Sequence, residues 1–158
     1  MMGSVALADD AATAKLGARL GRALAAGDAV LLSGDLGAGK TALARAAIAA
    51  RLEAAGRPSE AIPSPTFTLM QSYEADIPIL HVDLYRLGDV SELYELGLDE
   101  AFEEAACFVE WPERLGPLAP ARRLEIALSP PPEGGRRLAW RAVGPGWERV
   151  AAALGATA

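Results

Sequence analysis

The chain has 158 residues, of which 51% are hydrophobic, and this is enough for one compact domain with a buried core. Its net charge of -6 and its isoelectric point near 4.8 argue against an independent nucleic-acid-binding protein, which usually presents a basic face. One cysteine, Cys107, excludes an internal disulfide and fits a reducing compartment. We find neither a signal-peptide pattern nor an apolar run near the roughly 20 residues that span a bilayer, so we expect a cytoplasmic protein.

The first elements expected along the chain are a helix, a buried strand and a second helix. Residues 9–26 form the first helix, because Asp9 and Asp10 can cap its start and leucines recur at helical spacing. An apolar strand follows at 29–33, and a helix rich in Ala, Leu and Arg begins at Thr41 and ends near Ala55.

Residues 34–41 lie between this strand and this helix and read Gly-Asp-Leu-Gly-Ala-Gly-Lys-Thr, a full match to the phosphate-loop pattern. The glycines permit backbone angles and an approach to phosphate that a Cβ would block. Lys40 can place its ammonium on the β- and γ-phosphates, and the Thr41 hydroxyl can bind Mg²⁺. Lysine is rare here, since Lys15 and Lys40 are the only two. The loop therefore predicts a nucleoside-triphosphate site made by Asp35, Leu36, Gly37, Ala38, Gly39, Lys40 and Thr41.

The middle of the chain predicts an antiparallel hairpin. Residues 62–65 are punctuated by prolines and cannot be helical. They lead into a strand at 66–73, rich in aromatic and β-branched residues, and a second strand follows at 77–85 after a short turn. So short a connection joins antiparallel strands, which departs from a purely parallel sheet.

The remaining elements are short. We expect helices at 92–96 and 100–105, a buried strand at 107–111, a loop at 112–120, strands at 124–128 and 137–143, and a last helix at 147–154. Residues 1–158 are thus expected to form a single α/β domain, a P-loop NTPase core with a mixed parallel and antiparallel sheet flanked by helices, in which the C-terminal strands and helix occupy about 123–155.

Two carboxylates end apolar runs and are candidates for holding hydrated Mg²⁺ or orienting water, namely Asp83 and Glu110. His81, the only histidine, lies two residues before Asp83 and on the same face of that strand. It could act as a catalytic base, but we favour a hydrogen-bonded packing role. Tyr85, by the same reasoning, is assigned with Tyr94, Trp140 and Trp147 to the core or an interface.

The chain contains no Asn, so it lacks the Asn-Lys-x-Asp element that usually marks guanine-specific proteins of this class. We therefore expect ATP rather than GTP.

Five segments, in this order, resemble the motif series of the bacterial TsaE (YjeE) family. They are Gly34-Asp35-Leu36-Gly37-Ala38-Gly39-Lys40-Thr41, Ser64-Pro65-Thr66-Phe67-Thr68-Leu69, His81-Val82-Asp83-Leu84-Tyr85-Arg86-Leu87, Leu96-Gly97-Leu98-Asp99-Glu100 and Val109-Glu110-Trp111-Pro112-Glu113. The resemblance extends from about Asp9 to Arg114 and is weak beyond. It implies an ATPase needed to make N6-threonylcarbamoyladenosine in tRNA, working with the transferase subunit TsaD and with TsaB. ATP hydrolysis in that family is thought to reset the complex between turnovers.

Residue by residue, the resemblance assigns roles around the loop. Thr41 and Glu110 match the Mg²⁺ positions, and Asp83 matches an acid implicated in hydrolysis or partner coupling. Thr66 matches a nucleotide-sensing switch, and Trp111 an aromatic beside the site. By looser alignment, Asp10, Thr13 and Arg136 match positions near the adenine. No strong candidate for an arginine finger is seen, and Arg86, the nearest by motif position, is better explained by a surface salt bridge.

Two other functions share the phosphate loop. A small-molecule phosphotransferase would need an acceptor pocket and usually a mobile, Arg-rich lid, for which the Pro-broken stretch 114–123 is short. A non-catalytic module would use ATP only to order the 62–72 segment for docking. The acidic charge indicates that any contact with tRNA is made mainly by partners.

Overall fold

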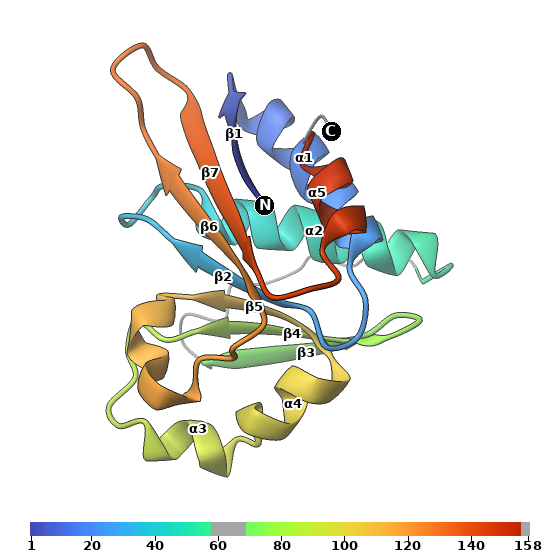
Figure 1. Cartoon of the computed structure of the whole chain (residues 1–158), viewed down its shortest axis with the longest axis vertical. Helices are drawn as coiled ribbons and strands as arrows, with labels where there is room; N and C mark the ends of the chain where they lie inside the picture. Colours follow the sequence, from blue (N-terminus) through green and yellow to red (C-terminus); the bar gives the residue numbers. More distant parts are fainter. Residues whose placement is uncertain (58–68, 156–158) are drawn as a thin grey trace.

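The computed structural model describes residues 1–57 and 69–155, which form one seven-stranded mixed sheet (Figure 1). The strand order is β1-β7-β6-β2-β5-β4-β3. The pairs β2–β6, β2–β5 and β4–β5 are parallel, whereas β3–β4, β6–β7 and β1–β7 are antiparallel. The strands are β1 (Met2–Leu7), β2 (Ala29–Ser33), β3 (Met70–Glu74), β4 (Pro78–Asp83), β5 (Ala106–Glu110), β6 (Arg123–Ser129) and β7 (Arg136–Val143).

Helices cover both faces of the sheet (Figure 1). On one face lie α1 (Asp10–Ala23), α2 (Lys40–Ala54) and α5 (Glu148–Ala153), and on the other lie α3 (Ser91–Glu95), α4 (Leu98–Glu104) and the 3₁₀ segment η2 (Pro112–Leu118). Central strands therefore carry apolar residues on both faces. In β2, for example, Val30 and Leu32 belong to the core under α1 and α2, whereas Leu31 belongs to the core under α3 and α4.

The helices α1 and α2 pack closely because α1 presents glycines to its neighbour. A Cβ built on Gly21 would lie 2.1 Å from the backbone oxygen of Ala47, and one on Gly17 would lie 2.9 Å from that of Leu43. This contact fixes α2, and with it the loop that precedes α2, against the N-terminal helix.

The expected mixed α/β sheet is confirmed, with three differences in its elements. The first helix ends at Ala23 rather than near residue 26, because Leu24 is already extended. Residues 112–118, expected as loop, form η2. The strand β1 was not expected at all; it is an edge strand whose side chains are mostly exposed or half-buried, so its apolar pattern is weak. Of the strand expected at 66–73, residues 66–68 lie outside the described residues.

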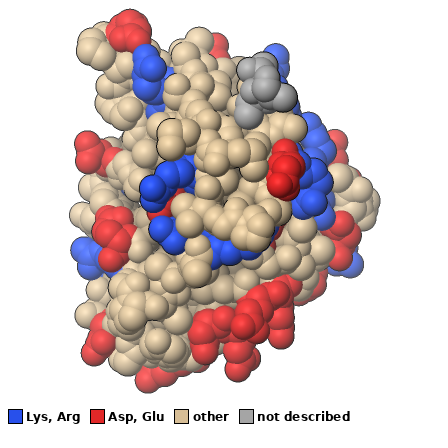
Figure 2. Space-filling model, viewed as in Figure 1, with Lys and Arg blue, Asp and Glu red and all other residues tan. Residues whose placement is uncertain are grey.

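Surface charge is unevenly distributed. Acidic side chains gather over the part of the surface formed by α3 and α4 (Figure 2). The sequence has no Lys or Arg between Arg86 and Arg114, while Glu95, Asp99 and Glu100 in this region are exposed. This surface repels nucleic-acid phosphates.

No helix in the described parts of the chain combines the length and the apolar character that crossing a membrane requires.

Candidate nucleotide-binding site

The phosphate loop connects the end of β2 to the start of α2, as the sequence predicts. Gly34 and Gly39 both have positive φ, of 143° and 105°, and a Cβ on Gly34 would lie 2.6 Å from the backbone oxygen of Leu128 in β6. The loop lines a cavity of about 230 Å³ together with Asp83, Tyr85, Glu110 and Trp111. Free amides at the start of α2 add the anion-attracting end of a helix to this cavity.

Lys40 is buried and directed back onto its own loop. Its Nζ donates to the carbonyl oxygens of Gly34 and, at 3.3 Å, Asp35, and lies 3.8 Å from the ring centroid of Trp111. Burial lowers the pKa of the Lys40 ammonium, while the carboxylates of Glu110 and Asp83 act to raise it. The ammonium is thus held at the phosphate loop by weak neutral acceptors, which an anionic phosphate would outcompete.

Thr41 and Glu110 meet across the cavity although they are far apart in sequence. The Thr41 Oγ1 donates to Glu110 Oε1 over 2.7 Å. The second carboxylate oxygen, Oε2, lies 2.6 Å from Nε2 of His81. Glu110 is 2% exposed and His81 is fully buried, whereas Thr41 is half-buried at the edge of the cavity.

Asp83 stands beside Glu110 because of the strand register. The two residues are direct partners in the parallel pair β4–β5, at the ends of both strands. Asp83 is buried, and its Oδ1 accepts from the backbone N–H of Tyr85 over 3.0 Å. The two carboxylates predicted from the sequence therefore converge on one edge of the loop.

The donor set around Thr41 fits Mg²⁺. A hydroxyl and two carboxylates are the oxygen ligands that this ion prefers, and it commonly takes only one or two carboxylates and completes its shell with phosphate oxygens and water. Within the described residues, no group of three or more His, Cys, Asp or Glu side chains could hold a metal alone. The arrangement therefore suits an ion that arrives with a nucleotide.

On the other side of the loop, the structure brings together three residues that the sequence aligned only loosely. Arg136 donates from Nη1 to Asp10 Oδ1 over 2.8 Å and to Thr13 Oγ1 over 3.1 Å. The Arg136 side chain also packs against Gly39, since a Cβ on this glycine would lie 2.8 Å from Arg136 Nε. A second cavity, of about 190 Å³, opens here between the loop and Arg136.

Tyr85 is a site residue that sequence reasoning missed, because it was assigned to the core or an interface. It is 39% exposed, lines the loop cavity, and its ring centroid lies 5.1 Å from that of Trp111. Trp111 itself has a positive φ of 59°, which is costly for a bulky residue. The signal available in the sequence was the position of Tyr85 two residues after Asp83, at the end of a strand.

Two other residues considered in the sequence are not part of the described site. Thr66 lies outside the described residues. Arg86 is exposed and does not line the loop cavity.

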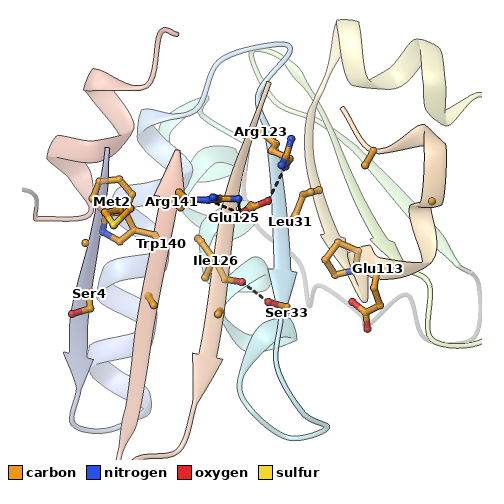
Figure 3. A pocket seen from close by; sticks show the side chains of 16 residues that line it. Met2, Ser4, Leu31, Ser33, Glu113, Arg123, Glu125, Ile126, Trp140 and Arg141 are labelled. Atoms are coloured by element: carbon orange, nitrogen blue, oxygen red, sulfur yellow. Dashed lines mark hydrogen bonds and ion pairs between the residues drawn. The ribbon is translucent and has the colours of Figure 1, made fainter. Parts of the chain in front are cut away.

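A larger hollow, of about 1010 Å³, lies away from the phosphate loop over β1, β7, β6 and β2 (Figure 3). Space is left above the sheet here because small residues lie side by side across the four strands, namely Ser4, Ala139, Ala127 and Ser33. Beside these residues, Glu125 accepts from Arg123 over 2.8 Å and from Arg141 over 2.9 Å. Burial acts to raise the pKa of Glu125, but these two hydrogen bonds lower it. The charges of Arg123, Glu125 and Arg141 are thus paired with one another beside the hollow.

The mixed sheet and the phosphate loop between β2 and α2 define a P-loop NTPase fold. The crystal structure of YdiB from Bacillus subtilis has the same fold, with a TM-score of 0.75 and 29% sequence identity over 98% of this chain and 94% of that chain. Residues 7–138 match the family model described as threonylcarbamoyl adenosine biosynthesis protein TsaE. The chain belongs to the TsaE family.

Relatives from distant bacteria agree with this assignment. The tRNA threonylcarbamoyladenosine biosynthesis protein TsaE of Mycobacterium tuberculosis is 44% identical over 126 residues, which are 73% of this chain and 72% of the relative. The protein of the same name from Nostoc sp. is 39% identical over 142 residues, covering 86% of this chain and 83% of the relative. The family, and so this chain, is linked to the biosynthesis of threonylcarbamoyladenosine.

Proposed function

We propose that this protein binds ATP with Mg²⁺ at the phosphate loop and hydrolyses it in support of tRNA N6-threonylcarbamoyladenosine synthesis, acting with TsaD and TsaB. The observation that carries the proposal is the 2.7 Å contact between Thr41 Oγ1 and Glu110 Oε1 at the start of α2. It joins the hydroxyl and the carboxylate that a P-loop NTPase uses around its metal ion.

Each side chain of the loop cavity has a distinct task in this proposal. Lys40 would exchange its carbonyl acceptors for the β- and γ-phosphates, and Thr41 and Glu110 would hold the Mg²⁺ ion. The ion supplies neutralisation of the charge that develops on the phosphates. Asp83, buried beside Glu110, accepts a hydrogen bond from the attacking water and orients it.

The side chains that line the same cavity support slow ATP hydrolysis by the isolated chain. No arginine is among the described residues that line it, so nothing there resembles an arginine finger. Such a residue contributes on the order of 10³-fold or more to turnover in related chemistry. We therefore infer that the partner proteins complete or gate the site, and the family's link to threonylcarbamoyladenosine synthesis supplies the class of partner.

The deciding measurement is ATP hydrolysis by the chain alone and mixed with TsaB and TsaD, with Lys40→Ala as the inactive control. We expect weak activity alone, a clear rise with both partners, and loss of both activities in the variant. Equal rates with and without the partners would contradict the role of the partners. Strong activity without partners would favour an independent hydrolase or phosphotransferase, and tight binding without turnover would favour the ATP-dependent docking module.

A further inference from the structure

We propose that His81 is a positioning residue, which fixes the carboxylate of Glu110 in the orientation that Thr41 and Mg²⁺ require. The inference rests on the proposed function, because it concerns the same metal site. It differs from both roles weighed from the sequence, a catalytic base and a packing residue.

The geometry begins with the strand register. In the parallel pair β4–β5, His81 is opposite Phe108 and Asp83 is opposite Glu110. Side chains alternate along a strand, so His81, Asp83 and Glu110 share one face, and His81 is the diagonal neighbour of Glu110. This placement puts the imidazole behind the carboxylate, on the side away from Thr41.

Both oxygens of Glu110 are then occupied. Oε1 accepts from the Thr41 hydroxyl over 2.7 Å, and Oε2 lies 2.6 Å from His81 Nε2. A carboxylate can only accept, so Nε2 carries the proton and donates it. With one fixed donor on each oxygen, rotation of the carboxylate would break a buried hydrogen bond, and Glu110 is held in one orientation.

The position of His81 excludes the role of a catalytic base. The ring is fully buried, and its Nε2 is already committed to Glu110. The other nitrogen, Nδ1, is also buried and makes no hydrogen bond within the described part of the molecule. Neither nitrogen is therefore placed to take a proton from water in the loop cavity.

The unpartnered Nδ1 also argues against simple packing. A buried polar atom without a partner is unfavourable, and an apolar side chain of similar size would avoid it. The benefit must come from the other end of the ring, where the hydrogen bond reaches a residue of the metal site. Partners of this kind commonly change metal affinity by about 10- to 100-fold when they are removed.

The first test compares two substitutions. His81→Gln keeps an N–H donor near the position of Nε2, whereas His81→Met fills a similar volume without a donor. We measure binding of a fluorescent ADP analogue at equilibrium, with Mg²⁺ and with EDTA. His81→Met should lose about tenfold of the Mg²⁺-dependent gain in affinity and keep its Mg²⁺-free affinity, while His81→Gln should recover most of the gain.

Ile79→Val is the matched control, because Ile79 is buried on the same strand and lies outside the loop cavity. It should lower stability and leave the Mg²⁺-dependent gain unchanged. Equal losses with and without Mg²⁺ in His81→Met, or no recovery in His81→Gln, would overturn the positioning role. If the nucleotide affinity of the wild-type protein did not depend on Mg²⁺, the proposed function would be overturned as well.

A second measurement does not require a substitution of His81. His81 is the only histidine, so in an untagged protein the imidazole signals in ¹H–¹⁵N NMR spectra belong to it alone. We expect the Nε2-protonated tautomer with a slowly exchanging proton, and a marked shift of that proton in Glu110→Gln. An Nδ1-protonated tautomer, or a proton signal indifferent to Glu110→Gln, would contradict the proposal.

Discussion

Among the described residues, the buried Asp, Glu, Lys and His side chains fall into two groups. Lys40, His81, Asp83 and Glu110 are clustered at the phosphate loop, where each has a task in the proposed chemistry. Asp28 is different, because it lies at the other end of β2, where it connects neighbouring segments of the chain. It accepts from the backbone N–H of Ala25 over 2.8 Å and from Arg122 over 2.8 Å.

The pair formed by Asp28 and Arg122 predicts a clear stability effect. Arg122→Met keeps the aliphatic stem but leaves the Asp28 carboxylate, 2% exposed as a residue, without its nearest charged partner. We expect the free energy of unfolding to fall by about 2 kcal/mol, measured by urea denaturation. Arg137→Met, which removes an exposed 3.5 Å ion pair with Glu133, is the control and should change it by less than about 0.5 kcal/mol. Equal losses of stability in the two variants would show that the burial of Asp28 does not strengthen its ion pair with Arg122.

Cys107 predicts a loss of stability at alkaline pH. Burial raises the pKa of its thiol to about 12, and burial also raises the pKa of Tyr73. The unfolded chain releases the thiol proton near pH 8.5, so between about pH 8.5 and 12 the folded state holds a proton that the unfolded state has lost. The free energy of unfolding should therefore be level below this range and fall as the pH rises through it.

Urea midpoints between pH 8 and 10.5 test this prediction, with Cys107→Ala as the comparison. The variant should be less stable at pH 8, because it leaves a small cavity, but its midpoint should fall less steeply with pH. Parallel pH profiles for the two proteins would contradict the assigned role of the thiol.

At the scale of elements, apolar patterns predicted the interior of the sheet and failed at the edge formed by β1. Strands β2 and β5 appear as continuous apolar runs because both of their faces are buried. The strand β1 has no such run, and its pairing with β7 depends on a partner more than 100 residues away. Helices α1 and α2 were predicted because capping and spacing are local properties.

The candidate site also has features that local sequence predicts and features that it does not. The loop, Thr41 and the carboxylates of Asp83 and Glu110 were predictable, since each follows from a local motif. The bond between His81 and Glu110 was not, because it depends on the register of β4 and β5. The neighbouring rings of Tyr85 and Trp111 depend on the same alignment of strand ends.

The close contact between α1 and α2 predicts that Gly21→Ala is severe, although alanine favours helices. The new Cβ would lie 2.1 Å from the backbone oxygen of Ala47, and backbone cannot move aside as a side chain can. We expect a loss of at least about 1–3 kcal/mol in the free energy of unfolding. Lys15→Ala, on the exposed face of the same helix, should change it by less than about 0.5 kcal/mol. A stabilised Gly21→Ala protein would show that the helices can separate without loss.

On the scale of the whole molecule, β1 joins the N-terminus of the chain to the strand that carries Arg136. Leu7 is opposite Arg136 in this pair. Deletion of residues 1–7 should expose the edge of β7, lower the urea midpoint and weaken nucleotide binding, because Arg136 loses its fixed position beside Asp10. Ser4→Ala keeps the strand backbone and serves as the control. Unchanged nucleotide affinity after the deletion would show that α1 alone positions Arg136.

The pairing of β1 with β7 also has a consequence for the order in which the site is completed during translation. Met2 is synthesised long before its strand partner Arg141. A nascent chain that has just completed α2 already carries the loop, but it lacks Glu110, Leu128 beside Gly34, and Arg136. The pocket is therefore complete only after β7, with Arg136, has been synthesised. A chain that stops before β7 should therefore bind nucleotide more weakly than one that includes this strand.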